Sequence, residues 1–217
     1  MTLRKTIETF KAELLSEAPE DLVRRYVFAG TPYAFRNTPD DLRALRTHLC
    51  DELPLTPENV IVVGSAQTGF SLSPEKFPRQ FHSGSDIDVL VVDPSLFDKV
   101  WVTILEWHYP RRGLRLPQLD WDWKQKRTTE LYWGWFVPSE IAFEGLTLPQ
   151  VIKPLRDIST KWFNAFRSLG HLAQFASRDV KARLYRSWEH AMLYHVAGLK
   201  TISQRLRAAK KGYLYGV

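Results

Sequence analysis

Cysteine is nearly absent from this sequence of 217 residues, and long apolar runs are missing. The single cysteine, Cys50, excludes an internal disulfide framework, which is typical of proteins in a reducing compartment. No apolar run approaches the about 18 residues of a membrane span. The opening MTLRKTIETFKAEL has the pattern of a charged amphipathic helix rather than of a secretion signal. We therefore expect a cytoplasmic protein with no membrane segment.

Several common binding signatures are also missing from the chain. There is no Gly-x-x-x-x-Gly-Lys phosphate loop and no Rossmann glycine pattern. Cys50 has no His or Cys partner at ligand spacing, which argues against a zinc site. Apolar residues make up 44% and aromatic residues 13% of the chain, which indicates a folded globular protein rather than a disordered one.

Charge is divided unevenly along the chain. Residues 1–109 carry 11 Lys/Arg and 16 Asp/Glu, whereas residues 110–217 carry 19 and 8. A basic second half suits a polyanionic partner such as an oligonucleotide or RNA. A basic helical region that is merely solvated would explain the count equally well. The charge pattern alone leaves both interpretations open.

The most informative segment joins a glycine turn to a pair of aspartates. The wholly apolar run 60–63 predicts a buried strand, and it ends at Gly64 and Ser65. A second strand, 86–92, opens with Asp86 and Asp88. Side chains at positions i and i+2 of a strand project from one face, so the two carboxylates point together. Mg²⁺ binds one or two carboxylates and completes its shell with water and phosphate, so this segment predicts a phosphoryl- or nucleotidyl-transfer site.

This order of residues resembles the DNA polymerase β-like nucleotidyltransferase superfamily. It is most similar to single-domain bacterial members, some associated with antiviral (phage) defence, including Hailong-type enzymes that make oligonucleotide signals. The resemblance implies that Gly64 lets the backbone approach a phosphate and that Ser65 helps to hold the outer phosphates of the nucleotide. It also implies that Asp86 and Asp88 are catalytic and ligate Mg²⁺ or Mn²⁺, two ions lying about 4 Å apart.

The activity that this resemblance implies is transfer of a nucleoside monophosphate from an NTP or dNTP, ATP among them, to an acceptor hydroxyl. The implied partners are a nucleoside triphosphate, an oligonucleotide or RNA acceptor, and an effector or antitoxin protein. Two other functions stay open. One is a toxin-like enzyme that nucleotidylates RNA or protein, and the other is a non-catalytic module that binds nucleotide or nucleic acid.

The chain departs from the family pattern in the loop between the two motifs. Twenty residues separate Ser65 from Asp86, roughly twice the usual length in the family. Lys76 and Arg79 lie in this loop, and we expect them to contact the triphosphate, although a solvated loop is an equal alternative. We treat both as candidate nucleotide-binding residues.

A second departure concerns a third acid, which the family often supplies from a later strand. Glu130 is the first choice here, because it directly precedes the apolar segment 131–137. Asp122 or Asp120 is the next choice, and absence of a third acid is a further possibility. A third carboxylate would bind the metal that lowers the pKa of the attacking hydroxyl.

Two further groups of residues have a binding and a structural interpretation. Lys124, Lys126 and Arg127 form a basic cluster suited either to a nucleic-acid backbone or to solvent. Trp133 and Trp135 alternate along the expected strand 131–137, where each would either stack on a base or pack in the sheet. His195 lies on an apolar helical stripe, and we expect it to be a core residue.

The expected fold class is α+β, with a nucleotidyltransferase-type mixed sheet, N-terminal helices and a C-terminal helical bundle. The catalytic region is expected over 1–145 and the C-terminal helical region over 146–217. The segment 111–127 is ambiguous, with 119–123 alternating like a strand and 118–130 compatible with a helix. The remaining patterns predict helices over 3–16, 20–28, 40–52, 94–109, 155–168 and 178–210, and strands over 60–63, 86–92 and 131–137.

Overall fold

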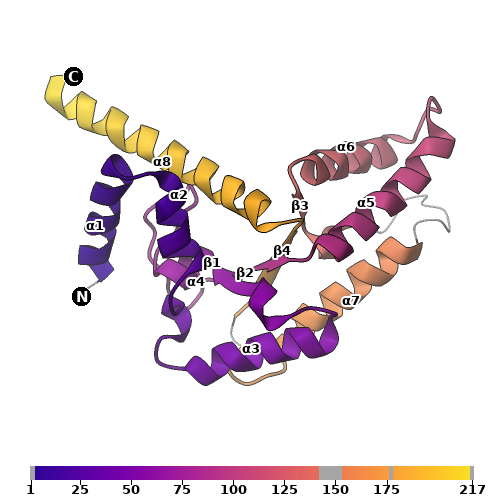
Figure 1. Ribbon diagram of the computed structural model, residues 1–217, viewed down its shortest axis with the longest axis horizontal. Coiled ribbons are helices and arrows are strands. Elements are labelled where there is room, and N and C mark those ends of the chain that lie inside the picture. The colour runs from indigo at the N-terminus through magenta and orange to yellow at the C-terminus, as the bar shows by residue number, and fades with distance from the viewer. Residues whose placement is uncertain (1–2, 142–152, 176–177, 216–217) are drawn as a thin grey trace.

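A computed structural model describes residues 3–141, 153–175 and 178–215, with side chains as far as residue 210. It is a mixed α+β structure in which helices surround one small sheet (Figure 1). The α-helices are α1 (Leu3–Ser16), α2 (Pro19–Leu22), α3 (Pro39–Glu52), α4 (Gly64–Thr68), α5 (Pro94–His108), α6 (Gln118–Tyr132), α7 (Lys153–Leu169) and α8 (Trp188–Tyr215). The strands are β1 (Val60–Val63), β2 (Ile87–Val92), β3 (Trp135–Phe136) and β4 (Val180–Tyr185). A π-helical segment, Val23–Phe28, continues α2, and short 3₁₀ turns occupy Tyr33–Phe35, Pro57–Asn59, Tyr109–Arg111 and Pro138–Glu140.

The four strands form one mixed sheet in the order β1-β2-β4-β3. Strand β2 runs antiparallel to β1 and parallel to β4, and β3 runs antiparallel to β4. The register pairs Val63 with Asp88, and Asp88 with Lys181. The N-terminal segment therefore supplies one edge of the sheet, and a strand from residue 180 onward lies in its interior.

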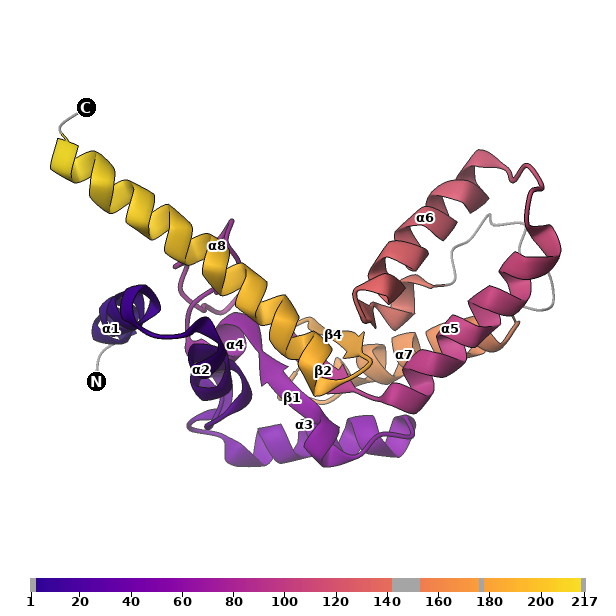
Figure 2. The same ribbon diagram turned by 45° about the horizontal axis from the view of Figure 1, so that its top comes forward.

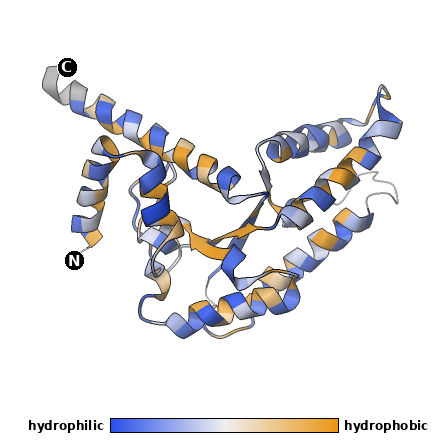
Figure 3. Ribbon diagram, in the orientation of Figure 1, coloured by the Kyte–Doolittle hydropathy of each residue, from blue (hydrophilic) through white to orange (hydrophobic). Residues whose placement is uncertain are grey.

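Strands β1 and β2 are apolar almost throughout, as Figure 3 shows by colour. Such a composition is typical of strands covered on both faces, because neither face is left to water. Val89 and Val91 belong to one buried cluster, with residues of α3, α5 and α7. Leu90 and Val92 belong to a second cluster, with residues of α1, α2 and α8. We refer to these two sides of the sheet as the α3 face and the α8 face.

Helices from distant parts of the chain meet on each face. On the α3 face, α7 packs against α3 and α5, whereas on the α8 face the long α8 lies along α1 and α2. Figures 1 and 2 show α3 and α7 on one side of the sheet, with α8 extending from the other. Helices α7 and α8 thus contact opposite faces.

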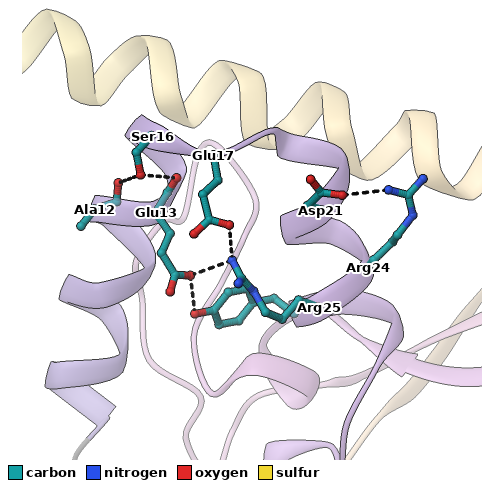
Figure 4. A network of polar contacts seen from close by, with 8 residues as sticks. Ala12, Glu13, Ser16, Glu17, Asp21, Arg24 and Arg25 are labelled. Atoms are coloured by element: carbon teal, nitrogen blue, oxygen red, sulfur yellow. Dashed lines mark hydrogen bonds and ion pairs between the residues drawn. The ribbon is translucent and has the colours of Figure 1, made fainter.

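A polar network ties the first helix to the segment that follows it (Figure 4). The Arg25 guanidinium contacts the Glu17 carboxylate at 2.6 Å and the Glu13 carboxylate at 3.2 Å. The Tyr26 hydroxyl donates to Glu13 at 2.7 Å. Burial, together with this hydrogen bond, raises the pKa of Tyr26 to about 12. This network fixes α1 beside α2, under α8.

Several expected elements are confirmed. The helices over 3–16, 40–52, 94–109 and 155–168 and the strands over 60–63 and 86–92 all form, within a few residues of the expected ends. Asp93 caps α5 by accepting a hydrogen bond from the Leu96 amide at 2.9 Å, and Pro94 occupies the first helical position. In the ambiguous segment 111–127, the helical alternative over 118–130 is the correct one.

Two expected elements are wrong. The helix over 178–210 begins only at Trp188, because Val180–Tyr185 forms β4 inside the sheet. Positions four apart share a face in a helix and in a strand alike, so the stripe through Val180 and Leu184 fitted both. The strand over 131–137 shrinks to Trp135–Phe136, because α6 continues through Tyr132.

The expected boundary between the catalytic region and the C-terminal helical region lies at residues 145 and 146. Both are outside the described residues. The mixed sheet and the α+β class are as expected, but the C-terminal helical bundle is wrong, because β4 enters the sheet and α7 and α8 pack on opposite faces of it. Where the structure describes the chain, no helix combines the length and apolarity needed to cross a membrane.

Candidate functional site

The turn after β1 brings the backbone unusually close to an aspartate. Gly64 has a φ of 65°, a left-handed conformation that favours glycine. A Cβ at this position would lie 2.7 Å from Asp88 Oδ2. A side chain here would force the Asp88 carboxylate to move, and the backbone conformation itself favours glycine. Ser65 follows in α4, a single turn of helix where the sequence suggested a loop.

Both aspartates reach the α8 face of the sheet. Asp86 directly precedes β2, and Asp88 is its second residue. Both line an open cavity of about 1600 Å³ that Gly64 and Ser65 also line. The cavity walls partly desolvate Asp88, and this effect and the charge of Asp86 raise the pKa of Asp88. The two carboxylates thus lie together beside the glycine turn, with ionisation of Asp88 disfavoured until a cation approaches.

Strand β4 places two cationic side chains on the α8 face of the sheet. Lys181 lies opposite Asp88 in the parallel register, and its Nζ contacts Asp86 Oδ2 at 2.6 Å. The hydrogen bond to Asp86 raises the pKa of Lys181. Arg183, two residues further along the same face, also lines the cavity. The sequence interpretation missed both residues because it assigned them to a helix, although the alternation in VKARLY was a signal for a strand.

The long loop between the motifs closes one side of the cavity. Lys76 and Arg79 both line it, as the sequence suggested. The loop is held at its base, where the Phe81 amide donates to the Gly69 carbonyl at 2.9 Å. Arg178 Nη1 donates to the carbonyls of His82 at 3.0 Å and Ser85 at 3.1 Å, which fixes the chain just ahead of Asp86.

Glu130 lies in a different environment from the two aspartates. It is buried near the end of α6, where its carboxylate contacts Arg127 Nη1 at 2.7 Å, and it does not line the cavity. Burial raises the pKa of Glu130. Of the alternatives, Asp120 is buried in the same helix and Asp122 accepts a hydrogen bond from Gln118. Among the described residues no group of three His, Cys, Asp or Glu side chains could hold a metal ion.

Only part of the basic cluster of α6 lies at the surface. Arg127 is 1% exposed and lies between Glu130 and Glu140, so it cannot contact a nucleic-acid backbone. Lys126 contacts Glu140 at 2.9 Å, and Lys124 lies over the exposed ring of Trp121. Arg127 is therefore buried, whereas Lys126 is exposed and Lys124 is partly exposed.

The two tryptophans of the expected strand 131–137 have different surroundings. Trp135 is in β3, beside Arg183 and Tyr194. Trp133 follows the end of α6 and is 56% exposed, on the cavity wall. His195 is shielded in α8, and burial lowers its pKa to about 4, as expected for a core histidine.

Asp86 and Asp88 suit a hard divalent cation that takes only some of its ligands from the protein. Two carboxylates on one face meet the need of Mg²⁺ for one or two protein oxygens, with water and phosphate as the remaining ligands. Asp86 already has Lys181 as a partner, so a cation there would share or displace that ammonium. Lys76, Arg79 and Lys181 add positive charge suited to phosphate oxygens.

Comparison with known proteins adds no constraint on this site. No protein-family model matches the chain, and neither the search of curated proteins nor that of solved structures finds a match.

Proposed function

We propose that this chain is a metal-dependent nucleotidyltransferase that moves a nucleoside monophosphate from a nucleoside triphosphate to a hydroxyl. The observation that carries the proposal is the contact between the Gly64 turn and Asp88. It brings a side-chain-free backbone, the Ser65 hydroxyl and two carboxylates into one cavity. Chemistry on a triphosphate needs this combination of a phosphate cradle and hard anionic ligands.

Each residue has a role in this proposal. Asp86 and Asp88 would hold Mg²⁺ or Mn²⁺, whose charge stabilises the phosphoryl oxygens and lowers the pKa of the acceptor hydroxyl. The Gly64 backbone and Ser65 bind the outer phosphates. Lys76 and Arg79 neutralise the triphosphate from the loop above. The protein orients the reacting groups for in-line displacement of pyrophosphate rather than forming a covalent intermediate.

A non-catalytic nucleotide-binding module is the second candidate, and one contact favours it. Lys181 occupies the strand beside Asp86 and Asp88, on the face where a third carboxylate would have come from a neighbouring strand. A cation in that place suits phosphate binding but does not activate a hydroxyl. The module would bind a metal-nucleotide complex without turning it over.

The test is a product assay with all NTPs and dNTPs in Mg²⁺ or Mn²⁺, read by mass spectrometry, beside a binding assay with a fluorescent ATP analogue. Asp86→Asn and Asp88→Asn should each lower transfer about a hundredfold or more, because a metal ion contributes several kcal/mol of charge stabilisation. The matched control is Asp98→Asn. Asp98 is a half-exposed aspartate paired with Arg186 at 3.0 Å, outside the cavity.

The two candidates give different results. Product formation that depends on both cavity aspartates supports the transferase. Metal-dependent nucleotide binding without product, with the same dependence on Asp86 and Asp88, supports the module. Transfer at the wild-type rate in both variants would eliminate the proposed role of the pair.

A further inference from the structure

One wall of the cavity is formed by large apolar side chains that are exposed instead of packed. They are Tyr132, Trp133, Leu193 and Tyr194, which are 81%, 56%, 66% and 38% exposed. They come from the end of α6, the residue that follows it and the first half of α8. Exposed apolar side chains gathered on one wall of a cavity, rather than scattered singly, indicate a binding surface.

The turn after α6 holds Trp133 in this position. Gly134 has a φ of 73°, and its amide donates to the Leu131 carbonyl at 3.0 Å. A Cβ on Gly134 would overlap the His190 ring of α8, so the two elements touch at this point. The Arg186 amide donates to the Gly134 carbonyl at 2.9 Å, which ties the turn to the end of β4. Trp133 is thus presented by a fixed backbone.

Cations lie directly beside the aromatic wall. The Arg183 guanidinium lies 4.3 Å from the centre of the Trp135 ring and 4.6 Å from that of Tyr194. Lys181 is two residues before Arg183 on the same face. Stacked aromatic rings next to fixed cations suit a ligand that combines flat bases with phosphates.

The order of the strands separates this wall from the glycine turn. Gly64 and Ser65 follow β1, at one edge of the sheet, and Trp135 is in β3, at the other. Asp86 directly precedes β2 and Asp88 is in it, and β2 lies between those two edges. The cavity therefore has a phosphate-binding side and an aromatic side, with the two aspartates in the middle.

We propose that the aromatic side binds a single-stranded oligonucleotide, whose bases stack on Trp133 and Tyr194 and whose phosphates contact Lys181 and Arg183. This inference rests on the proposed function in one respect: the hydroxyl at the end of the bound strand is the acceptor. A single strand fits because its bases are unpaired and offer their faces to the rings. Stacking is tolerant of sequence, so the site accepts many base compositions.

The experiment measures binding of fluorescently labelled ten-nucleotide U and dT oligomers by anisotropy, with the full chain in Mg²⁺. Trp133→Ala should weaken oligomer binding about fivefold to a hundredfold, the loss expected for one stacked base. Trp133→Phe should recover most of the affinity, since it keeps a ring. Trp121→Ala is the matched control, because Trp121 is 45% exposed in α6, the helix just before Trp133, but lies outside the cavity.

Three results would overturn the inference. The first is absence of oligomer binding by the wild-type chain at low salt. The second is equal affinity in the Trp133→Ala and Trp121→Ala variants. The third is a loss of ATP-analogue binding in Trp133→Ala with oligomer binding unchanged, which would assign the wall to the base of the incoming nucleotide. Circular dichroism of each variant shows whether the fold is retained, and Trp133→Phe keeps the test valid if Trp133→Ala unfolds.

Failure of the proposed function gives a different pattern. If the wild-type chain binds oligomer through Trp133 but forms no product with any nucleotide, the oligonucleotide site stands and the transferase proposal fails. If transfer depends on Asp86 and Asp88 but neither oligomer binding nor transfer responds to Trp133→Ala, the transferase stands and the acceptor is of another class.

Discussion

Two short carboxylate–cation pairs in this protein have opposite surroundings. Asp86 and Lys181 meet at 2.6 Å with side chains 40% and 60% exposed, whereas Glu130 and Arg127 meet at 2.7 Å with side chains 8% and 1% exposed. The first pair faces the cavity, so water, a metal or a phosphate can replace either partner at small desolvation cost. The second is closed off, and removing one partner leaves a buried charge. The environment of a carboxylate, more than its place in the sequence, decides whether it can bind a ligand.

The largest effect that distinguishes the two pairs is on stability. Glu130→Ala should lower the free energy of unfolding by about 3–5 kcal/mol, because it removes the carboxylate that contacts the buried Arg127 at 2.7 Å. Asp86→Ala should change it by no more than about 1 kcal/mol, as for an exposed pair. Urea denaturation measures both values. A Glu130→Ala variant that keeps wild-type stability but loses transfer would show that Glu130 acts in catalysis. It would contradict the structural role assigned to the Glu130–Arg127 pair.

A smaller effect is expected from removing the Ser65 hydroxyl, which lines the same cavity as the Asp86–Lys181 pair. Ser65→Ala should lower kcat/KM for the nucleotide about tenfold to a hundredfold, since a hydrogen bond to a charged group contributes about 1.5–3 kcal/mol. Ser16→Ala is the control, because the Ser16 hydroxyl bonds to the Ala12 carbonyl within α1 (Figure 4). Unchanged kinetics at saturating metal would mean that Ser65 is only a turn residue.

The smallest effect concerns how pH acts on the cavity acids. Because the pKa of Asp88 is raised on folding, the native state binds more protons than the unfolded state between the ordinary aspartate pKa and the raised one. Stability from this group is therefore present at low pH and lost as pH rises through that window. Asp88→Asn should raise the melting temperature slightly at neutral pH, with the difference vanishing in acid.

Asp86→Asn is the control for that measurement. It removes the partner of Lys181, so it should leave the melting temperature unchanged or lower it. An Asp88→Asn variant that is less stable than the wild type at pH 7 would mean that the ionised carboxylate is favoured in the folded protein.

The elements that could be predicted from sequence have strong local signals. Strand β1 is four apolar residues closed by a glycine, and α5 begins at Asp93-Pro94, a cap followed by a first-turn proline. The elements that could not be predicted depend on partners. Strand β4 is a strand because β2 and β3 lie on either side of it, and its apolar positions, taken alone, also match a helical stripe. The end of α6 had a local signal, the left-handed Gly134 two residues after Tyr132, but the apolar run 131–137 also matched a strand.

The sequence by itself determined the α+β class, the paired direction of Asp86 and Asp88, and the glycine turn ahead of them, because each follows from alternation or conformational preference within a few residues. Only the tertiary structure decided which charged side chains lie beside the two aspartates. It buried Glu130 with Arg127 and brought Lys181 to Asp86 across 95 positions of chain. It also placed Trp133 after the end of α6 and Trp135 in β3, where both line the cavity. Burial and long-range pairing depend on how the sheet and helices pack, so they cannot be predicted from the local spacing of residues.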